Sequence, residues 1–288
     1  MAGAQTNIEQ DDLDEDLRER VGQLLSATLP TTPVTGTAKD LFLLRRHKLF
    51  YFNFDPSVTY TNNAFYQPTK RSDWFARGRM VLGANTLIAG RYDVDINLNY
   101  STTKYSKYAN LSFDNWGVDT TISTYVGPLI IGGNYQHIVY TQLGLGPNIQ
   151  GTHLASAFAL YVHRFTDRIG ATVRGSWGYA FIGGVGPYDY SLVQVSPGFY
   201  IRATDTLTVS GDVYWLQKDY KHYFRDFFDG ERKDDQIGAG LELSYRPLIH
   251  RWLEMSVEVR YTQNYSTIDA FDFDSIDGTG MFKATARF

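Results

Sequence analysis

The residues with charged or reactive side chains are spread along this sequence instead of gathered in one motif. Asp93 and Asp95 stand two positions apart, a spacing that places both carboxylates on one face of a β-strand and could hold a cation. Three arginines, Arg77, Arg79 and Arg91, precede them closely. We therefore expect ion pairs at this position and no metal site.

A nucleophile with its activating base is the next possibility. His153 and Ser156 are close in sequence, but a strand sends residues three apart to opposite faces, so they do not form a catalytic pair there. The chain has no cysteine, which excludes thiol nucleophiles, thiolate metal sites and disulfides. It also lacks a glycine-rich phosphate loop and a basic stripe. We expect no enzyme, no cofactor and no nucleic-acid partner.

The composition is that of a folded chain. Aromatic residues make up 15% of the 288 residues at a mean hydropathy of −0.30, which argues against disorder, and the net charge is only −4. No apolar run approaches the roughly 20 residues that a membrane-spanning helix needs. The first residues show no signal peptide, so we expect that an exported protein would have lost it.

The clearest pattern is a strict alternation of apolar and polar residues. From Leu253 to Tyr261, apolar residues alternate with Glu, Ser, Glu and Arg, which is the period of a strand with one apolar face. The same pattern predicts twelve strands, each long enough to cross a bilayer when tilted. They are predicted at residues 48–61, 73–86, 91–101, 116–126, 129–141, 153–164, 168–181, 191–202, 206–217, 235–246, 252–264 and 277–288.

The connections between these strands alternate in length. They are short after even-numbered strands, as at residues 127–128, and mostly long and polar after odd-numbered strands, as at residues 102–115 and 218–234. Short periplasmic turns and long extracellular loops are typical of outer-membrane barrels. The sequence thus predicts an all-β fold, a transmembrane antiparallel up-and-down β-barrel of twelve strands in the bacterial outer membrane. Phe288 is predicted to be the signal that the barrel-insertion machinery reads.

Residues 1–46 differ in kind from the barrel, which we place at residues 47–288. The apolar residues between Leu13 and Leu25 fall on one stripe of a helix, and prolines then end it. We expect a periplasmic amphipathic helix and linker. It is either the stub of a periplasmic domain, which would bind a periplasmic partner, or a plug that enters the lumen. The other expected partners are the lipid bilayer and lipopolysaccharide.

The polar face is predicted to line the lumen, because an Arg or Lys that faces lipid at mid-bilayer costs about 2–4 kcal/mol. The two signs nearly balance, which predicts little ion selectivity. The charged residues expected inside are Asp55, Arg77, Arg79, Arg91, Asp93, Asp95, Asp119, Arg174, Arg202, Asp212, Glu242, Arg246, Glu254, Glu258, Arg260, Lys283 and Arg287.

No charged residue stands between Asp119 and Arg164, so one side of the lumen is predicted to be neutral. The expected neutral residues are Tyr125, Asn134, Gln136, Tyr140 and Tyr161, with Ala155, Ala157 and Ala159 beside them. Either the alanines make room for the N-terminal segment, or the tyrosines and amides form a track for sugars. The third possibility is that the charges pair and close a narrow barrel.

The first hairpin carries a pattern of its own. Residues 54–65 read Phe-Asp-Pro-Ser-Val-Thr-Tyr-Thr-Asn-Asn-Ala-Phe, and Arg-Ser-Asp-Trp follows at residues 71–74. This resembles the opening of the proteobacterial β-barrel porin family, in which a Tyr-x-x-Asn-x-Phe-like turn ends the first strand and Ser-Asp begins the second. The resemblance implies an outer-membrane channel or export component, some members being linked to surface polysaccharide, with no catalytic set to carry over.

The expected function is therefore an outer-membrane channel that passes or exports a hydrophilic solute, with polysaccharide as one candidate. A closed barrel that anchors a periplasmic or surface assembly is the first alternative. An outer-membrane lipid-modifying hydrolase is the second, because some twelve-stranded outer-membrane barrels are lipid hydrolases. The sequence lacks the His-x-Ser-Asn-Gly stretch of the phospholipase type, which argues against this second alternative.

Overall fold

The computed structural model describes residues 50–89, 91–142, 150–166, 168–182, 189–220, 231–247 and 252–287. The helix expected within residues 1–46 and the C-terminal Phe288 lie outside them. The described chain forms β1 (Phe50–Thr61), β2 (Asp73–Ile88), β3 (Tyr92–Tyr105), β4 (Phe113–Val126), β5 (Leu129–Gln142), β6 (Gln150–Arg164), β7 (Ile169–Ile182), β8 (Tyr190–Arg202), β9 (Leu207–Tyr220), β10 (Lys233–Tyr245), β11 (Leu253–Ser266) and β12 (Phe273–Arg287).

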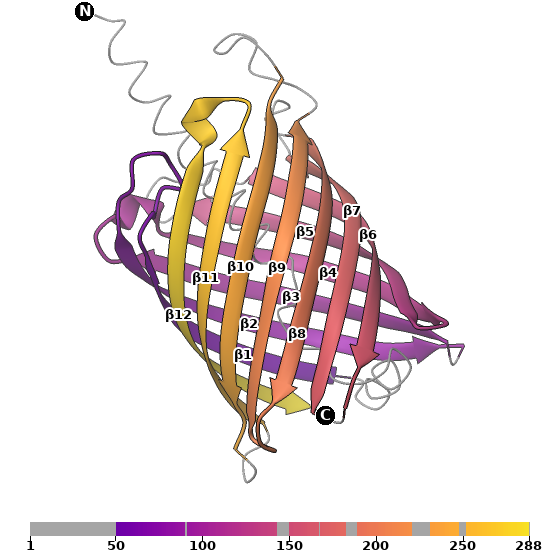
Figure 1. Ribbon diagram of the computed structural model, residues 1–288. Helices are drawn as coiled ribbons and strands as arrows, with labels where there is room; N and C mark the ends of the chain where they lie inside the picture. The colour runs from indigo at the N-terminus through magenta and orange to yellow at the C-terminus, as the bar shows by residue number, and fades with distance from the viewer. Residues whose placement is uncertain are drawn as a thin grey trace, which may run out of the picture.

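These strands form one closed antiparallel barrel. Each strand pairs with its neighbours in sequence, and β1 closes the ring by pairing with β12 from Tyr51 opposite Arg287 to Thr61 opposite Asp277. Figure 1 shows the strands strongly tilted around a common axis, with β8–β12 in front and β1–β5 behind. The predicted twelve-strand, up-and-down barrel is therefore confirmed.

The strands are longer than the alternation predicted, chiefly at the ends next to the long connections. β3 continues to Tyr105 instead of residue 101, and β12 begins at Phe273 instead of residue 277. At those ends the outward positions carry polar residues such as Thr102 and Lys104, because the sheet has left the apolar layer while its backbone pairing continues. The alternation thus marks the membrane boundary instead of the strand end.

The two rims differ in their connections. The β4–β5 hairpin turns in two residues, Gly127 and Pro128, and Gly127 has a φ of 57°, the left-handed region that glycine adopts without strain. At the opposite rim, short 3₁₀ helices lie between strands at Ala109–Leu111 and Asp269–Phe271. By the length rule, the first rim faces the periplasm and the second faces the outside of the cell.

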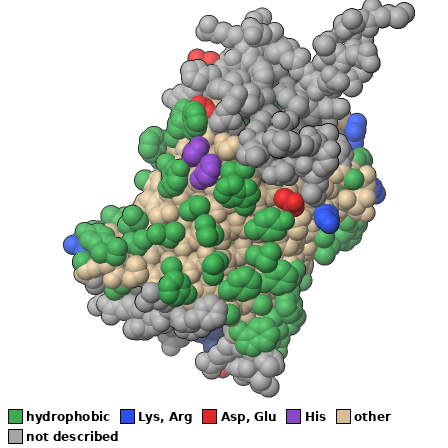
Figure 2. Space-filling view, turned by 180° about the vertical axis from the view of Figure 1, so that it is seen from behind, with side chains coloured by type: hydrophobic (Ala, Val, Ile, Leu, Met, Phe, Trp, Pro, Cys, Tyr) green, Lys and Arg blue, Asp and Glu red, His purple; other side chains and the backbone are tan. Residues whose placement is uncertain are grey.

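Large apolar side chains cover the outer surface. Figure 2 shows them distributed over one face of the barrel. Trp74, Trp116, Trp177 and Trp252 are each more than half exposed, which is the placement of aromatic side chains at a membrane interface. Among the described residues, no helix is long and apolar enough to cross a membrane. The chain is an outer-membrane β-barrel.

Candidate functional site on the inner wall

The inward face of each strand follows from the register with its neighbours. Trp177 is 60% exposed on the outer surface, and Ala157 lies directly opposite it on β6. Tyr135, which is also exposed, lies opposite Ala155. The intervening positions of β6, such as Ser156, therefore point into the barrel.

One arginine and two carboxylates form an ion-pair cluster on the inner wall. Arg260 on β11 donates two hydrogen bonds to Asp212 on β9, with Nη2–Oδ1 and Nη1–Oδ2 distances of 3.0 and 3.3 Å. Its Nε also donates to Glu258 Oε1 at 2.9 Å. All three side chains are partly buried, so the attraction is screened less than that of a surface pair. The charge of Arg260 is therefore fully compensated within the wall.

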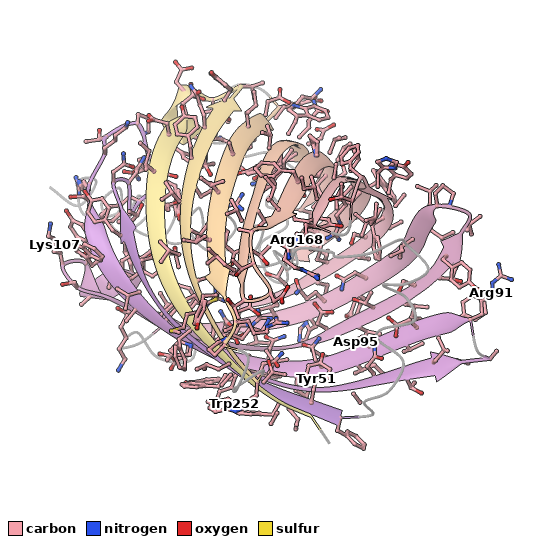
Figure 3. The ribbon with its side chains drawn as sticks, turned by 60° about the horizontal axis from the view of Figure 1, so that its bottom comes forward. Tyr51, Arg91, Asp95, Lys107, Arg168 and Trp252 are labelled. Atoms are coloured by element: carbon pink, nitrogen blue, oxygen red, sulfur yellow. The ribbon has the colours of Figure 1, made fainter. Side chains whose placement is uncertain are left out.

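Glycines allow long inward side chains to lie against the sheet instead of projecting into the lumen. Tyr51 on β1 crosses Gly83 on β2, where an added Cβ would stand 2.1 Å from its ring, and its hydroxyl donates to Asp95 on β3 at 2.8 Å. Figure 3 shows Tyr51 and Asp95 near one another on the wall. Tyr214 crosses Gly238 in the same way.

The predicted pair of aspartates is held by amides as well as by tyrosine. Asn85 Nδ2 donates to Asp93 Oδ1 at 2.7 Å and to Asp95 Oδ2 at 3.3 Å, and Asn97 Nδ2 donates to Asp95 at 3.5 Å. Among the described residues, no three histidine or carboxylate side chains form a metal-binding group. The contacts of the two aspartates thus include amide and phenol hydrogen bonds.

Asp119 accepts hydrogen bonds from two residues of the predicted neutral track. Asn134 Nδ2 and Gln136 Nε2 donate to its two carboxylate oxygens at 2.9 and 2.8 Å. Tyr125 also faces inward, on β4 close to the periplasmic turn. The side chain of Tyr140 lies outside the described part of the structure.

Strand β6 has the opposite orientation to the one that the sequence suggested. The alanines and Tyr161 face outward, and Tyr161 is 38% exposed there. The inward positions hold Leu154 and Val162, both buried, together with Phe158. The inward positions are largely apolar, whereas the outward positions carry small residues and two histidines. The rule that polar residues point inward therefore gives the wrong face, and register with β5 and β7 decides the orientation.

The inner wall consequently has an apolar sector instead of a neutral polar track. It runs from β6 to β9 in the half near the extracellular rim, and its members pack on one another: Leu154, Ala180, Tyr190, Leu192, Tyr214, Leu216 and Tyr220. Arg174 stands beside this sector, with its guanidinium 5.0 Å from the centroid of the Phe158 ring. The remaining strands carry most of the inward charges.

Several predicted lumen charges lie elsewhere. Arg91 is exposed in the β2–β3 turn, and Figure 3 shows it pointing away from the barrel. The alternation placed it at the start of a strand, but β3 begins one residue later, at Tyr92. Arg246 follows β10 at the rim and pairs with Glu254. The side chain of Arg287 is outside the described part. Asp277, which the sequence did not assign to the lumen, lies opposite Arg260 on the inner face.

The other predicted charges keep their inward positions. They lie on strands whose alternation is unambiguous. The net charge of the inner wall is more negative than predicted, because Arg91 and Arg246 lie outside the lumen and Asp277 lies inside it. The residues that keep their inward positions are Asp55, Arg77, Arg79, Asp93, Asp95, Asp119, Arg174, Arg202, Asp212, Glu242, Glu254, Glu258, Arg260 and Lys283.

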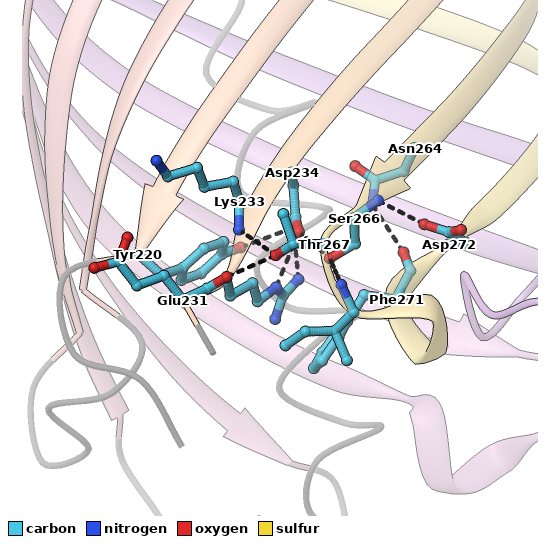
Figure 4. A network of polar contacts seen from close by, with 11 residues as sticks. Tyr220, Glu231, Lys233, Asp234, Asn264, Ser266, Thr267, Phe271 and Asp272 are labelled. Atoms are coloured by element: carbon cyan, nitrogen blue, oxygen red, sulfur yellow. Dashed lines mark hydrogen bonds and ion pairs between the residues drawn. The ribbon is translucent and has the colours of Figure 1, made fainter. Parts of the chain in front are cut away.

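A second polar network ties the strands together at the extracellular rim. Arg232 Nε and Nη2 bind the two oxygens of Asp234 at 3.1 and 2.6 Å, and Ser266 Oγ donates to the same carboxylate at 2.7 Å. The Arg232 guanidinium lies between the rings of Tyr220 and Phe271, 4.2 and 3.4 Å from their centroids. Figure 4 shows how these contacts join β9, β10 and β11. Sequence reasoning treated this region only as a loop.

Comparisons with known proteins support the fold. No family model matches the chain, and no curated protein matches its sequence. An outer membrane channel from Pseudomonas putida F1 aligns with a TM-score of 0.56 at 7% identity, over 83% of this chain and 96% of that one. The NanC porin (0.48, 6%, 80% and 98%) and LpxR from Salmonella typhimurium (0.47, 7%, 80% and 99%) align less closely.

The similarity to bacterial outer-membrane barrels is thereby confirmed at the level of the fold. The expectation that the chain is not an enzyme is wrong as a conclusion, because it rested on the absence of particular motifs and the barrel fold does not exclude catalysis. The missing phospholipase-type stretch does not exclude catalysis of another kind.

Proposed function

We propose that this barrel is a channel that passes small hydrophilic solutes across the outer membrane. The observation that carries the proposal is the way inward side chains are held. Tyr51 and Arg260 each cross a glycine and bind a carboxylate on the wall itself, and Asn134 and Gln136 bind Asp119 on the wall. Side chains fixed along the sheet leave the axis of a twelve-strand barrel to solvent.

The chemistry of the wall indicates the class of solute. Carboxylates, amides and hydroxyls line most strands, which suits water and hydrated solutes, and the surplus of carboxylates favours cations over anions. Because the apolar sector occupies β6–β9, the polar part of the lumen wall lies mainly on the other strands. A hydrated cation or a small uncharged polar molecule is the solute that this arrangement fits.

Planar-bilayer recording tests the proposal directly. The full chain and a form without residues 1–46 are each inserted into a bilayer, and single-channel conductance is measured. Stepwise current from either form supports the channel, and current only from the shortened form identifies residues 1–46 as a plug. The absence of current from both forms would favour the closed barrel that anchors an assembly.

Whether a polymer such as a polysaccharide can pass needs a separate measurement. Liposome swelling with uncharged oligosaccharides of increasing length reports the largest sugar that enters. A sharp loss of swelling at short chains supports a pore for small solutes. Passage of long chains would support polysaccharide export, the function implied by the resemblance of the first hairpin.

A further inference from the structure

Two histidines lie side by side on the lipid-facing surface. His137 on β5 and His153 on β6 are directly opposite in register, and their rings stack with centroids 4.3 Å apart and planes inclined by 26°. Figure 2 shows two histidine side chains in contact on the outer surface, among apolar residues. Both lie on the outward face with Tyr135 and Ala155, so neither side chain lines the lumen.

Their position along the strands places them at the outer-leaflet interface. His153 is close to the start of β6, next to the extracellular rim, and His137 lies edge-on to Trp116, at 6.5 Å between ring centroids. Phe181 stands on the other side of the pair, 6.1 Å from His153. Ionisable side chains on a lipid-facing surface are costly and are retained where they perform a function. An aromatic anchor alone would be served by tyrosine or tryptophan.

The Nδ1 atoms of the two rings both face groups of the protein. His153 Nδ1 is 2.7 Å from the Tyr135 hydroxyl, the kind of outer contact that fixes the orientation of a ligating imidazole. His137 Nδ1 is buried against the protein. In both residues Nε2 is therefore the nitrogen left to meet a ligand from outside.

We propose that His137 and His153 form a binding site for a divalent transition-metal ion, of the Zn²⁺, Ni²⁺ or Cu²⁺ class. Zinc–nitrogen bonds of about 2.0–2.1 Å in a tetrahedron bring two nitrogens to roughly 3.3–3.4 Å from one another. Directly opposed strand residues have Cβ atoms about 4.5–5.5 Å apart, so the two imidazoles reach that separation once each ring turns out of the stacked arrangement and points its Nε2 at the ion. Imidazole nitrogen is a preferred ligand of these metals.

The two imidazoles fill only part of the coordination sphere. Among the described residues no third histidine or carboxylate joins them, so water or phosphate oxygens at the membrane surface complete it. An ion held in this way adds positive charge to the outer-leaflet interface. The site is independent of conduction through the lumen, because it lies on the opposite face of the sheet.

His163 provides a matched control. It is on the same face of β6 and stacks on Tyr161 at 6.2 Å, with its Nδ1 3.4 Å from the Tyr161 hydroxyl, but the residue opposite it on β7 is Ala171 instead of a second histidine. It therefore offers one imidazole in a similar environment. Loss of a single imidazole of this kind should leave a two-histidine site untouched.

The test uses Cu²⁺ as the probe on the full chain folded in detergent micelles. Calorimetry and the nitrogen hyperfine pattern of the Cu²⁺ electron paramagnetic resonance spectrum are measured for the wild type, His137→Phe, His153→Phe and His163→Phe. We expect the Kd to rise at least tenfold in the first two variants, with loss of the two-nitrogen pattern, and no change in His163→Phe. Heat-modifiable gel mobility verifies the fold, and His137→Gln and His153→Gln replace a variant that does not fold.

Two outcomes would overturn the site. One is a wild type that binds Cu²⁺ no more tightly than the His137→Phe/His153→Phe double variant. The other is an equal loss of affinity in His163→Phe, which would mean that scattered histidines bind the metal singly.

Discussion

Arg260 binds Asp212 across the intervening strand because the residue between them is Gly240. The three residues lie in one row over β9, β10 and β11, and a Cβ on Gly240 would stand 2.7 Å from Arg260 Nη2 and 3.0 Å from Asp212 Oδ1. A side chain at that position would occupy the space that the ion pair uses. The charge pattern of the inner wall therefore depends on a residue that carries no charge.

The first prediction is that Gly240→Ala makes the channel more cation-selective. The atom that the new Cβ meets is the free end of Arg260, which can move away cheaply, so the barrel still folds. Asp212 then loses its two hydrogen bonds and its charge becomes available to ions in the lumen. The reversal potential across a salt gradient should shift toward the cation equilibrium potential.

Gly280→Ala is the control for this substitution. Gly280 is also a strand glycine, on β12, and an added Cβ there meets nothing within 4 Å. We expect its reversal potential to match that of the wild type. Equal reversal potentials in both variants and the wild type would show that the Arg260–Asp212 pair does not shape the ion pathway.

The second prediction concerns the extracellular rim, where Arg232→Ala should lower the free energy of unfolding by about 3–5 kcal/mol. The substitution leaves Asp234, which is 1% exposed, without its bidentate partner and empties the space between the Tyr220 and Phe271 rings. Urea unfolding in lipid vesicles, followed by tryptophan fluorescence, measures the loss.

Lys70→Ala removes a comparable ion pair in a different setting. Lys70 pairs with Asp274 at the same rim, but both side chains are more than a third exposed. Such a pair contributes about 0–1 kcal/mol. If the two substitutions cost the same, burial and ring contacts do not account for the stability that we assign to Arg232.

The success of the sequence in predicting the barrel has a physical cause. Lipid on one face and water on the other impose alternation on every strand, and on β11 the apolar positions Met255, Val257 and Val259 are all more than a third exposed on the outer surface, with Glu258 and Arg260 inside. The same rule gives the wrong face for β6. Its inward residues are largely apolar, so only cross-strand register, which is a long-range property, decides the face.

The contacts of the inner wall were beyond sequence reasoning for another reason. The partner of Arg260 is 48 positions away, and the strand between them had to place a glycine in the same row. The Arg232 network likewise joins residues of a loop end to Phe271 in a 3₁₀ turn. Such pairs become visible only once register is known, because alternation gives the face of a residue and not its neighbours.

The orientation of β6 gives the third prediction. The chain has no cysteine, so a single introduced thiol reports its own surroundings. Ser156→Cys faces inward and should react with a small charged thiosulfonate reagent, whereas Ala157→Cys faces lipid opposite Trp177 and should be protected in vesicles. Mass spectrometry gives the labelled fraction of each. Preferential labelling of Ala157→Cys would restore the orientation that the sequence suggested.

The last prediction contrasts two arginines of the inner wall. Arg174 stacks on Phe158, and its Nε has no hydrogen-bond partner among the described contacts, whereas Arg260 holds Asp212 and Glu258. Arg174→Gln should therefore change the free energy of unfolding by less than about 1 kcal/mol, because no carboxylate is left unpaired.

Arg260→Gln leaves two partly buried carboxylates together without their cation, which should cost about 3 kcal/mol or more. Both substitutions remove one positive charge from the lumen, so both should raise cation selectivity in bilayer recordings. The two variants are therefore distinguished by urea unfolding and not by bilayer recordings. A loss of stability in Arg174→Gln as large as that in Arg260→Gln would mean that Arg174 has a carboxylate partner of its own, and that the apolar sector contains a buried ion pair.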